Sequence, residues 1–463
     1  MGNQSSVLRL RSRVTCPRCW HNFPPDECHW ISRDPLLLGD PRLGKEQQLR
    51  FLPTRFTIDG QAYDAKGMVC NELACPRCHL ALPRALLEME PTFVSILGSP
   101  SSGKSYFLAV MTWQLRDILK RYFSLSFGEI EPAFNVILNQ YEEMLFFSDK
   151  PDQQVTIQKT QLEGAHLYDE VSIANQVVRY TRPFIFSVKP LPGHANHQRL
   201  ATFSKALCLY DNAGEHFLPG EDTAQAPVTH HLALAQVLLF LFDPTQDPRF
   251  RAACAERTGD PQMQGKGKTY RQEKILREAA DRVRRYSGLS EKTKHARPLV
   301  VIVTKYDAWS SLLPRQELKM ESVIYQGSSG NGLNLDALNE VSAKVRRVLD
   351  DYAPEIVSAA EGFAEHVVYL PVSALGRSPD VVPNPTDPST TSLVIRPKDI
   401  RPLWVEMPLI YTLCHWSRGL ISYVTPRSAP AGNFVRNPTG DGRASAATTE
   451  GTKPLKLWKD TGT

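Results

Sequence analysis

The residues with the most specific chemistry lie in Gly98–Ser105, which reads Gly-Ser-Pro-Ser-Ser-Gly-Lys-Ser. This stretch follows the apolar, β-prone run Thr92–Leu97 and precedes a helical-looking run that begins near Tyr106. A glycine-rich loop between a strand and a helix presents backbone N–H groups and the positive end of the helix dipole to an anion. Lys104 would reach the terminal phosphates as a point charge, and the hydroxyl of Ser105 would ligate Mg²⁺. The loop predicts a phosphate site, and its candidate contacts are Gly98, Ser99, Pro100, Ser101, Ser102, Gly103, Lys104, Ser105 and Tyr106.

Two copies of one tetrapeptide place cysteines in pairs: Cys16-Pro-Arg-Cys19 and Cys75-Pro-Arg-Cys78. Each copy can present two thiolates on one side of a tight turn, and together they supply the tetrahedral sulfur set that Zn²⁺ prefers. The long insert between them contains a strand-like piece, Arg50–Ile58, and an Asp59-Gly60 hairpin turn. We therefore expect a zinc-ribbon-like β module in which one structural Zn²⁺ is held by Cys16, Cys19, Cys75 and Cys78.

A redox dithiol is the alternative interpretation of these cysteines. One Cys-x-x-Cys pair would suffice for that chemistry, and no thioredoxin-like pattern surrounds either pair. Further possible ligands lie nearby, and we expect them to pack or form hydrogen bonds: Cys28, Cys70, His21, His29 and His79. Disulfides are not expected, because no secretory apolar segment is present and the cysteine spacing is typical of metal ligands.

A carboxylate follows the apolar run Ala206–Tyr210, in the sequence Asp211-Asn-Ala-Gly214. At the end of a strand, Asp211 could hold Mg²⁺ through water, and the backbone N–H of Gly214 could contact a γ-phosphate. The pattern Asp-x-x-Gly is often only a turn. Its place after a phosphate loop favours the functional interpretation.

Two later loops could recognise a base. Thr304-Lys305-Tyr306-Asp307 follows the apolar run Leu299–Val303. The carboxylate of Asp307 can accept hydrogen bonds from guanine N1–H and the 2-amino group, a donor pair that adenine lacks. Ser373-Ala374-Leu375 follows another apolar run, and a backbone N–H there could donate to guanine O6.

The composition describes an ordinary soluble chain of 463 residues, of which 42% are hydrophobic and 22% charged. The formal net charge of +5 is small for this length and favours neither nucleic acid nor a membrane surface as a partner. The longest apolar strand, Val237–Phe242, is far shorter than the roughly eighteen residues that span a bilayer. We expect a cytoplasmic protein with no transmembrane segment.

The order of the hydrophobic runs predicts an α/β protein in which strands alternate with helices. Strands are expected at Thr92–Leu97, Pro183–Val188, Ala206–Tyr210, Gln236–Phe242, Leu299–Val303 and His366–Leu370. Helices are expected at Tyr106–Phe123, Ala133–Phe147, Tyr270–Tyr286, Leu335–Tyr352, Glu355–Phe363 and Met407–Ile421. The expected parts are a flexible leader (1–11), the zinc-ribbon-like module (12–88), a nucleotide-binding domain (89–424) and a disordered tail (425–463) rich in Pro, Gly, Ser and Thr.

Several of these elements occur in one order, each after an expected strand: Gly98–Ser105, Asp211–Gly214, Thr304–Asp307 and Ser373–Leu375. Over roughly residues 90–424 the chain resembles P-loop GTPases of the translation-factor-related, Ras-like class. The resemblance implies a three-layer P-loop fold with a mostly parallel sheet and a long insertion between the first helix and the second strand. The cysteine pairs, the insertion and Arg182-Pro183-Phe184 are similar to the bacterial "double-GTPase" group, which is thought to act in conflict or signalling systems.

The resemblance also implies roles for individual residues. Lys104 and Ser105 would bind the phosphates and Mg²⁺, Asp211 would support the metal, and Gly214 would contact the γ-phosphate. Lys305 would pack along the guanine plane. The residues implied to enclose the base are Thr304, Lys305, Asp307, Ser373, Ala374 and Leu375.

Two features depart from the family pattern. The first switch lies within the insertion, so its Mg²⁺-binding threonine is ambiguous: Thr181 is the first choice and Thr160 the second. Glu215 stands where Ras-like enzymes place the glutamine that orients the attacking water, and its carboxylate would repel a γ-phosphate. His216 could take that role instead. We therefore expect slow hydrolysis, with Lys104, Glu215 and His216 as the catalytic candidates.

The sequence thus predicts a GTP-binding switch that requires Mg²⁺, carries Zn²⁺ and responds to a protein effector or activator. A P-loop ATPase, in which Thr304–Asp307 is coincidental, is one alternative. A zinc-ribbon scaffold with an inactive nucleotide-binding domain is another.

Overall fold

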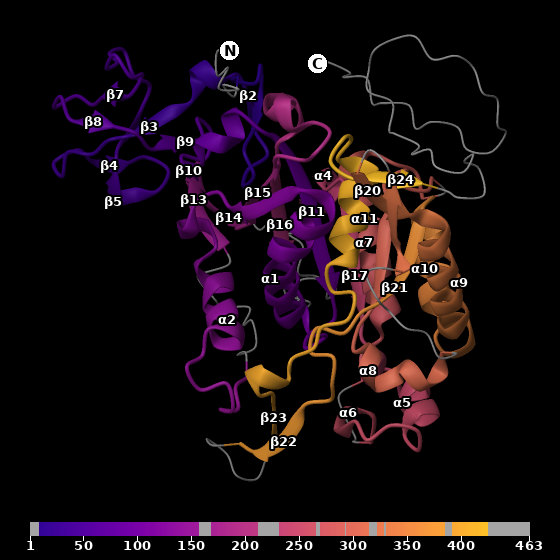
Figure 1. The fold of residues 1–463 in the computed structure, drawn as a ribbon. Coiled ribbons are helices and arrows are strands. Elements are labelled where there is room, and N and C mark those ends of the chain that lie inside the picture. The colour runs from indigo at the N-terminus through magenta and orange to yellow at the C-terminus, as the bar shows by residue number, and fades with distance from the viewer. Residues whose placement is uncertain are drawn as a thin grey trace.

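A seven-stranded mixed sheet forms the centre of the computed structural model, which describes residues 9–156, 168–211, 231–264, 269–291, 293–313, 322–327, 330–384 and 391–424 (Figure 1). In spatial order its strands are β12 (Leu125–Glu129), β15 (Phe184–Pro190), β16 (Lys205–Asp211), β11 (Glu90–Gly98), β17 (Val237–Phe242), β18 (Leu299–Val303) and β21 (Val367–Pro371). β16, β11, β17, β18 and β21 are parallel, whereas β15 runs antiparallel to both of its neighbours. The chain is therefore a mixed α/β protein.

The central strands are covered on both faces. All residues of β16, β17 and β18 are buried. A strand between two covering layers needs a nearly continuous apolar run, and Val237–Phe242 and Leu299–Val303 provide one. These two strands match the expected ranges to within one residue.

Helices pack against the sheet and against one another. The α-helices in the described part of the chain are α1 (Lys104–Phe123), α2 (Val136–Phe146), α3 (Leu200–Phe203), α4 (His231–Leu234), α5 (Pro248–Cys254), α6 (Pro261–Gln264), α7 (Gln272–Ser287), α8 (Tyr306–Trp309), α9 (Leu335–Tyr352), α10 (Pro354–Phe363) and α11 (Met407–Trp416). No helix in these ranges is both long enough and apolar enough to cross a bilayer.

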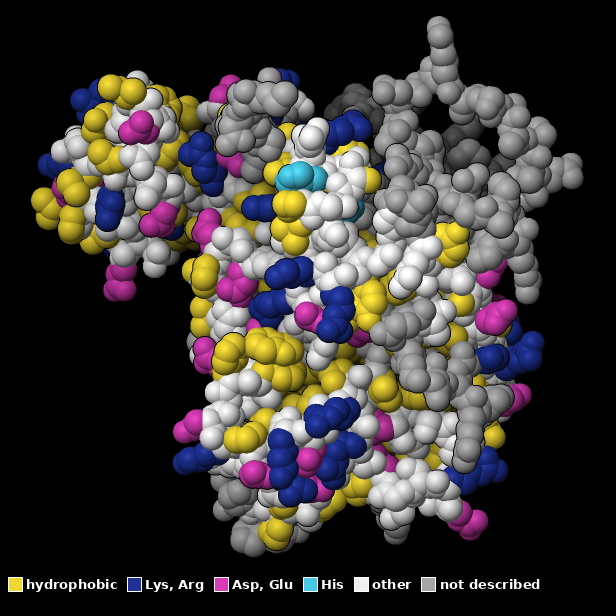
Figure 2. Space-filling model, viewed as in Figure 1, with side chains coloured by type: hydrophobic (Ala, Val, Ile, Leu, Met, Phe, Trp, Pro, Cys, Tyr) yellow, Lys and Arg dark blue, Asp and Glu magenta, His cyan; other side chains and the backbone are white. Residues whose placement is uncertain are grey.

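The N-terminal part consists of short strands around the cysteine pairs and overhangs the body of the molecule (Figures 1 and 2). Its strands are β1 (Val14–Thr15), β2 (Asn22–Phe23), β3 (His29–Ile31), β4 (Leu38–Asp40), β5 (Gly44–Gln48), β6 (Arg50–Phe51), β7 (Ala62–Tyr63), β8 (Val69–Cys70), β9 (Leu73–Ala74) and β10 (Ala81–Leu82). We call residues 12–88 the cysteine module. Its buried side chains continue directly into those on one face of β11, β15 and β16, including Phe93, Ile185 and Cys208.

Small sheets surround the main one. β13 (Tyr168–Ile173) and β14 (Gln176–Thr181) form a hairpin, as do β22 (Asp380–Pro383) and β23 (Thr391–Val394), and β19 (Ile324–Gly327), β20 (Gly330–Asn334) and β24 (Ser422–Val424) form a third sheet. In the space-filling view, basic and acidic side chains alternate over the visible face without a large patch of one sign (Figure 2).

Several expected elements differ in extent. The last helix ends at Trp416 rather than Ile421, because Gly419 adopts a left-handed φ of +80° and the chain then turns into β24. The strand expected over Arg50–Ile58 covers only Arg50–Phe51. The strand expected over Pro183–Val188 begins at Phe184 and continues to Pro190, and Thr181 is the last residue of the preceding strand, β14. The β13–β14 hairpin was not expected, and its turn residues Ala174 and Asn175 both have positive φ.

Gly376 illustrates a close backbone approach that the fold requires. Its φ is +72°, and a Cβ there would lie 1.6 Å from the backbone oxygen of Arg401. We expect Gly376→Ala to lower the free energy of unfolding by at least about 1–3 kcal/mol, the cost of placing alanine at this positive φ. Displacement of the Arg401 backbone by the new Cβ adds to that cost. Gly128→Ala is the matched control, because a Cβ at Gly128 meets no atom within 4 Å. Equal denaturant midpoints for the two variants would contradict this account.

Candidate functional site

The predicted motifs meet at one edge of the sheet. Because β16, β11, β17, β18 and β21 are parallel, their carboxyl ends lie at the same edge of the sheet. The chain passes from β11 to partners on one side and later returns to β17 on the other, so the end of β11 is a topological switch point. Ligands of open α/β sheets bind at such points, outside the carboxyl ends of the strands.

The loop after β11 has a backbone suited to an anion. Ser101 and Gly103 have left-handed φ values of +62° and +88°, and alternation of this kind turns successive N–H groups toward one side. Gly98 lies so close to β17 that a Cβ would be 2.7 Å from the backbone oxygen of Leu241. The N-terminus of α1 follows directly, at Lys104.

Lys104 is buried and folds back over its own loop. Its Nζ donates to the carbonyl oxygens of Gly98 at 3.0 Å and Ser99 at 2.9 Å. The ammonium group is therefore held at the loop. A phosphate bound there would add a charge-assisted partner.

Two glutamines hold the loop from outside, and sequence reasoning missed both. Ser99 Oγ donates to Gln246 Oε1 at 2.6 Å and lies 3.2 Å from Gln272 Oε1, while Gln246 Nε2 donates to the carbonyl of Pro100 at 2.9 Å. Gln272 also bonds the backbone of Asp243 at the end of β17. No local pattern marks a glutamine that acts through a loop far away in the sequence.

One cavity of about 180 Å³ brings three of the predicted motifs together. It is lined by Ser101, Ser102, Gly103 and Tyr106 of the first loop, by Thr304, Lys305 and Asp307, and by Ser373, Ala374 and Leu375. Pro379, Leu393, Val394 and Ile395 of the segment that contains β22 and β23 form an apolar wall. Whole small-molecule sites occupy about 300–1,000 Å³, so this cavity suits one ring system of a larger ligand.

Asp307 is placed for hydrogen bonding within this cavity. The hydroxyl of Ser373 donates to Asp307 Oδ1, and the backbone N–H of Gly376 donates to the same hydroxyl oxygen at 2.8 Å. Burial raises the pKa of the Asp307 carboxyl above its usual value. The sequence did not indicate that Ser373 orients Asp307, because the two residues come from different strands.

Lys305 is also held in place, by three side chains that the sequence did not single out. Its Nζ lies 2.7 Å from Asp243 Oδ2, and it donates to Thr245 Oγ1 at 2.9 Å and Gln262 Oε1 at 2.8 Å. Asp243 is fully buried at the end of β17, where only its position after an apolar strand could have drawn attention to it.

Asp211 and Thr181 lie outside the cavity lining. Asp211 is buried and is aligned with Ile96 of β11, two residues before Gly98. Thr181 is also buried, and it lies three residues before Phe184, the first residue of β15. Phe184 pairs with Leu209 of β16, so the chain enters the sheet at the edge where Asp211 ends β16.

The remaining residues of the glycine loop are not part of the cavity lining either: Gly98, Ser99, Pro100, Lys104 and Ser105. The predicted residues Gly214, Glu215 and His216, together with Thr160, lie outside the described residues.

The four cysteines of the two tetrapeptides converge on one point. Cys16, Cys19, Cys75 and Cys78 are buried, and their sulfur atoms all lie within 4.8 Å of one another. The Sγ atoms of Cys16 and Cys78 are 3.8 Å apart, and those of Cys19 and Cys75 are 3.6 Å apart. Sulfurs at the corners of a tetrahedron with metal–sulfur bonds of about 2.3 Å are about 3.8 Å apart, so this donor set fits a metal ion such as Zn²⁺.

The other candidate ligands in the module have different partners. Cys28 Sγ donates to the carbonyl of Ala74 at 3.4 Å, and burial raises the pKa of its thiol to about 12. His79 Nδ1 lies 2.8 Å from Asp40 Oδ2. Cys70 Sγ contacts Asp64 and the carbonyl of Met68.

The sequence matches no protein-family model and no curated protein at a significant level.

We expect the purified protein to contain one Zn²⁺ per chain by elemental analysis, and Cys16→Ser to lose it, because three thiolates leave the tetrahedral site incomplete. Cys28→Ser is the matched control: it replaces a buried cysteine of the same module whose thiol lies outside the cluster. Metal retained in Cys16→Ser, or lost in Cys28→Ser, would contradict the ligand set.

Proposed function

We propose that this protein is a Mg²⁺-dependent GTP-binding protein of the P-loop, Ras-like class that acts as a nucleotide-operated switch. The observation that carries the proposal is the cavity in which the glycine loop, Thr304–Asp307 and Ser373–Leu375 share one lining. Motifs far apart in the sequence are expected to converge in this way if they bind different parts of one nucleotide.

Guanine is the base that this lining favours. Ionised Asp307 accepts two hydrogen bonds, which match N1–H and the 2-amino group of guanine. Ser373 limits the rotation of that carboxylate, and the bond network around Lys305 keeps its stem beside the cavity. The apolar wall from the β22–β23 segment would exclude water from the base.

The phosphates would lie over the loop after β11. Its N–H groups, the start of α1 and Lys104 supply positive charge for the phosphates. Ser105 and Asp211 are the proposed Mg²⁺ partners, and Thr181 the proposed first-switch ligand. Mg²⁺ would neutralise charge on the β- and γ-phosphates. The proposed Zn²⁺ of the cysteine module does not itself contact the phosphates.

Hydrolysis in this proposal is slow. Glu215 replaces the usual water-orienting glutamine, and a carboxylate beside a γ-phosphate disfavours attack unless a partner changes its environment. A protein activator or effector therefore belongs to the proposed cycle, in which GTP orders the switch segments and hydrolysis releases them.

Equilibrium binding of fluorescent GTP and ATP tests the proposal. We expect GTP to bind more tightly than ATP. We expect Asp307→Asn to lower the affinity for GTP by about 10- to 150-fold, because the variant loses a hydrogen bond to a charged group. The same variant should gain affinity for xanthosine triphosphate, because the amide exchanges an acceptor for a donor at the base edge. ATP binding as tight as GTP binding would refute guanine recognition.

Lys104→Ala is the control for the phosphate end, and it should weaken both nucleotides by at least about 10-fold. In single-turnover hydrolysis the same variant serves as the blank. A wild-type rate equal to that blank would leave nucleotide binding in place but exclude catalysis by the isolated protein.

The affinity for GTP should depend on pH through Asp307. Burial raises the pKa of this carboxyl, so protonation begins at a higher pH than for an exposed aspartate with a pKa of about 3.9. Guanine needs the ionised form, and GTP affinity should therefore be constant near neutral pH and fall as the pH is lowered through the raised pKa. Titration of binding downward from neutral pH should show this fall in the wild type, beginning at a higher pH than an exposed aspartate would give, and not in Asp307→Asn.

A further inference from the structure

We propose that the four-cysteine site is an allosteric metal site: metal bound there strengthens binding of Mg²⁺ and nucleotide at the edge of the sheet. This inference rests on the proposed nucleotide site. It assigns the metal a regulatory function in addition to its structural one. The argument starts from the residues within and next to the first cysteine pair.

Pro17 is joined to the end of β16. Tyr210 Oη donates to the carbonyl oxygen of Pro17 at 2.5 Å, and the tyrosine side chain is fully buried. Tyr210 immediately precedes Asp211, the proposed Mg²⁺ partner. The turn between Cys16 and Cys19 therefore contacts the residue next to a proposed metal-supporting carboxylate.

Trp20 makes the second link. Its ring centroid lies 6.0 Å from that of Tyr180 and 6.5 Å from that of His231. Tyr180 directly precedes Thr181, the proposed first-switch ligand. His231 stacks on Tyr210 with centroids 4.5 Å apart, and its Nδ1 lies 2.7 Å from the hydroxyl of Ser95 on β11.

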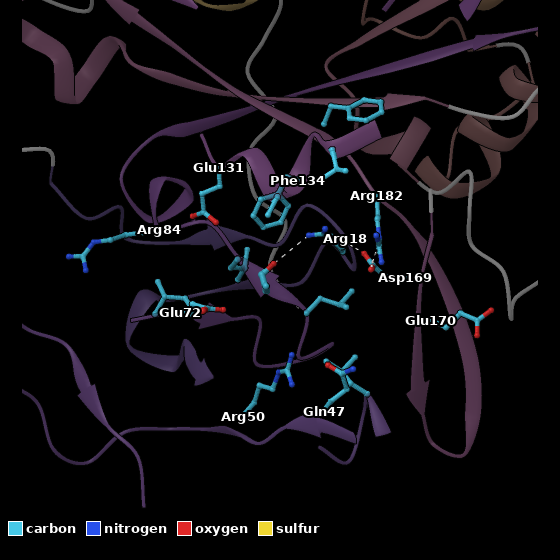
Figure 3. A pocket seen from close by; sticks show the side chains of 18 of the residues that line it. Arg18, Gln47, Arg50, Glu72, Arg84, Glu131, Phe134, Asp169, Glu170 and Arg182 are labelled. Carbon is cyan, nitrogen blue, oxygen red and sulfur yellow. Dashed lines mark hydrogen bonds and ion pairs between the residues drawn. The ribbon is translucent and has the colours of Figure 1, made fainter. Parts of the chain in front are cut away.

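Arg18 makes the third link (Figure 3). Its Nε lies 2.6 Å from Asp169 Oδ2, and Asp169 Oδ1 accepts a hydrogen bond from Arg182 Nε at 2.7 Å. Arg182 directly follows Thr181. The guanidinium of Arg18 also lies 5.0 Å from the ring centroid of Phe134.

A cleft lies beside the contact between Arg18 and Asp169. It has a volume of about 850 Å³ and separates strands of the cysteine module from the segment between β12 and α2 (Figure 3). Arg18, Asp169 and Arg182 form part of its lining, whereas Glu72 and Glu131 lie elsewhere on its wall. On this side the module contacts the body through the first cysteine pair and through Arg42, whose carbonyl accepts a hydrogen bond from the backbone N–H of Ser172 at 2.8 Å. Of these two contacts, the first cysteine pair is the one that reaches the residues beside Asp211 and Thr181.

The metal controls the shape of the first cysteine turn. The backbone N–H of Trp20 donates to the carbonyl of Cys16 at 3.0 Å. Trp20 also has a left-handed φ of +55°, which a non-glycine residue adopts only when its surroundings hold it. Four thiolates within 4.8 Å of one another repel unless a cation neutralises them. Loss of the metal should therefore loosen the turn and with it the links through Pro17, Arg18 and Trp20.

The second cysteine pair provides an internal contrast. His79, which follows Cys78, bonds to Asp40 within the module, and the peptide N–H of His79 donates to the carbonyl of Cys75 at 2.9 Å. This pair thus anchors the metal to the module, while the first pair connects the metal to the body.

The test measures binding in both directions on the full chain. Metal-loaded protein should bind a fluorescent, non-hydrolysable GTP analogue with Mg²⁺ more tightly than metal-stripped protein, by about 5- to 150-fold. Because coupling between two sites is reciprocal, the GTP analogue should raise the affinity for Zn²⁺, measured by competition with a chromogenic chelator, by the same factor. Equal GTP affinities of folded protein with and without Zn²⁺ would overturn the inference.

Tyr210→Phe keeps the test decisive if the stripped protein unfolds. This variant retains the ring on His231 and removes only the hydroxyl that reaches Pro17, so metal-loaded Tyr210→Phe should bind both the GTP analogue and Zn²⁺ more weakly than the wild type. Tyr63→Phe on β7 is the matched control and should leave both affinities unchanged. Wild-type affinities in Tyr210→Phe would refute the coupling. Failure of metal-loaded wild type to bind any nucleotide would instead refute the proposed function.

Discussion

The parallel pairing of β11 with both β16 and β17 is the constraint on which the rest of the structure depends. β11 is held by a strand on each side, so the point where the glycine loop begins is rigid. Close packing of Gly98 against Leu241, and the hydrogen bonds of Gln246 and Gln272 to Ser99, extend that rigidity into the loop. An anion site needs this, because N–H groups that are already oriented lose little conformational entropy when a ligand binds.

A second consequence of the parallel sheet is that residues from distant parts of the chain share one edge. Asp307 and Ser373 follow neighbouring strands, β18 and β21, and are brought into hydrogen-bond contact. Asp243 follows β17 and meets Lys305 in the same way. The two residues of each pair follow the carboxyl ends of two neighbouring strands. The loops there can differ without disturbing the core.

The cysteine module differs from the main sheet in how its elements are held together. Its strands are mostly two residues long, too short to bury much apolar surface, and its centre is the four-sulfur cluster. A metal bound at this cluster would stabilise the module. The sheet face that the module covers also stabilises it, because the buried side chains of the module join Phe93, Ile185 and Cys208. The module and the sheet face therefore share one core, which is the physical basis of the coupling proposed between them.

Strong local patterns predicted much of the fold. Apolar runs such as Leu299–Val303 and the periodic stretch Leu335–Tyr352 match a strand and a helix of the structure, and the two Cys-Pro-Arg-Cys copies do converge on one four-sulfur group. The β13–β14 hairpin and the early end of α11 were not predicted. The strands of the hairpin contain many polar residues, so no apolar run marks them. The turns at Ala174 and Gly419 depend on the surrounding chain, and the spacing of apolar residues does not predict them.

The sequence by itself determined which residues have side chains suited to phosphate, base and metal binding: the glycine loop with Lys104, the carboxylates Asp211 and Asp307, and the four cysteines. Such residues are recognisable because phosphate, metal and base binding require particular side chains at short, fixed spacing. Only the tertiary structure decided which of them meet and what holds them, as with Ser373 at Asp307, Asp243 at Lys305 and Tyr210 at Pro17. Those contacts join strands and loops far apart in the chain, so they arise from sheet order and register, which local sequence does not encode.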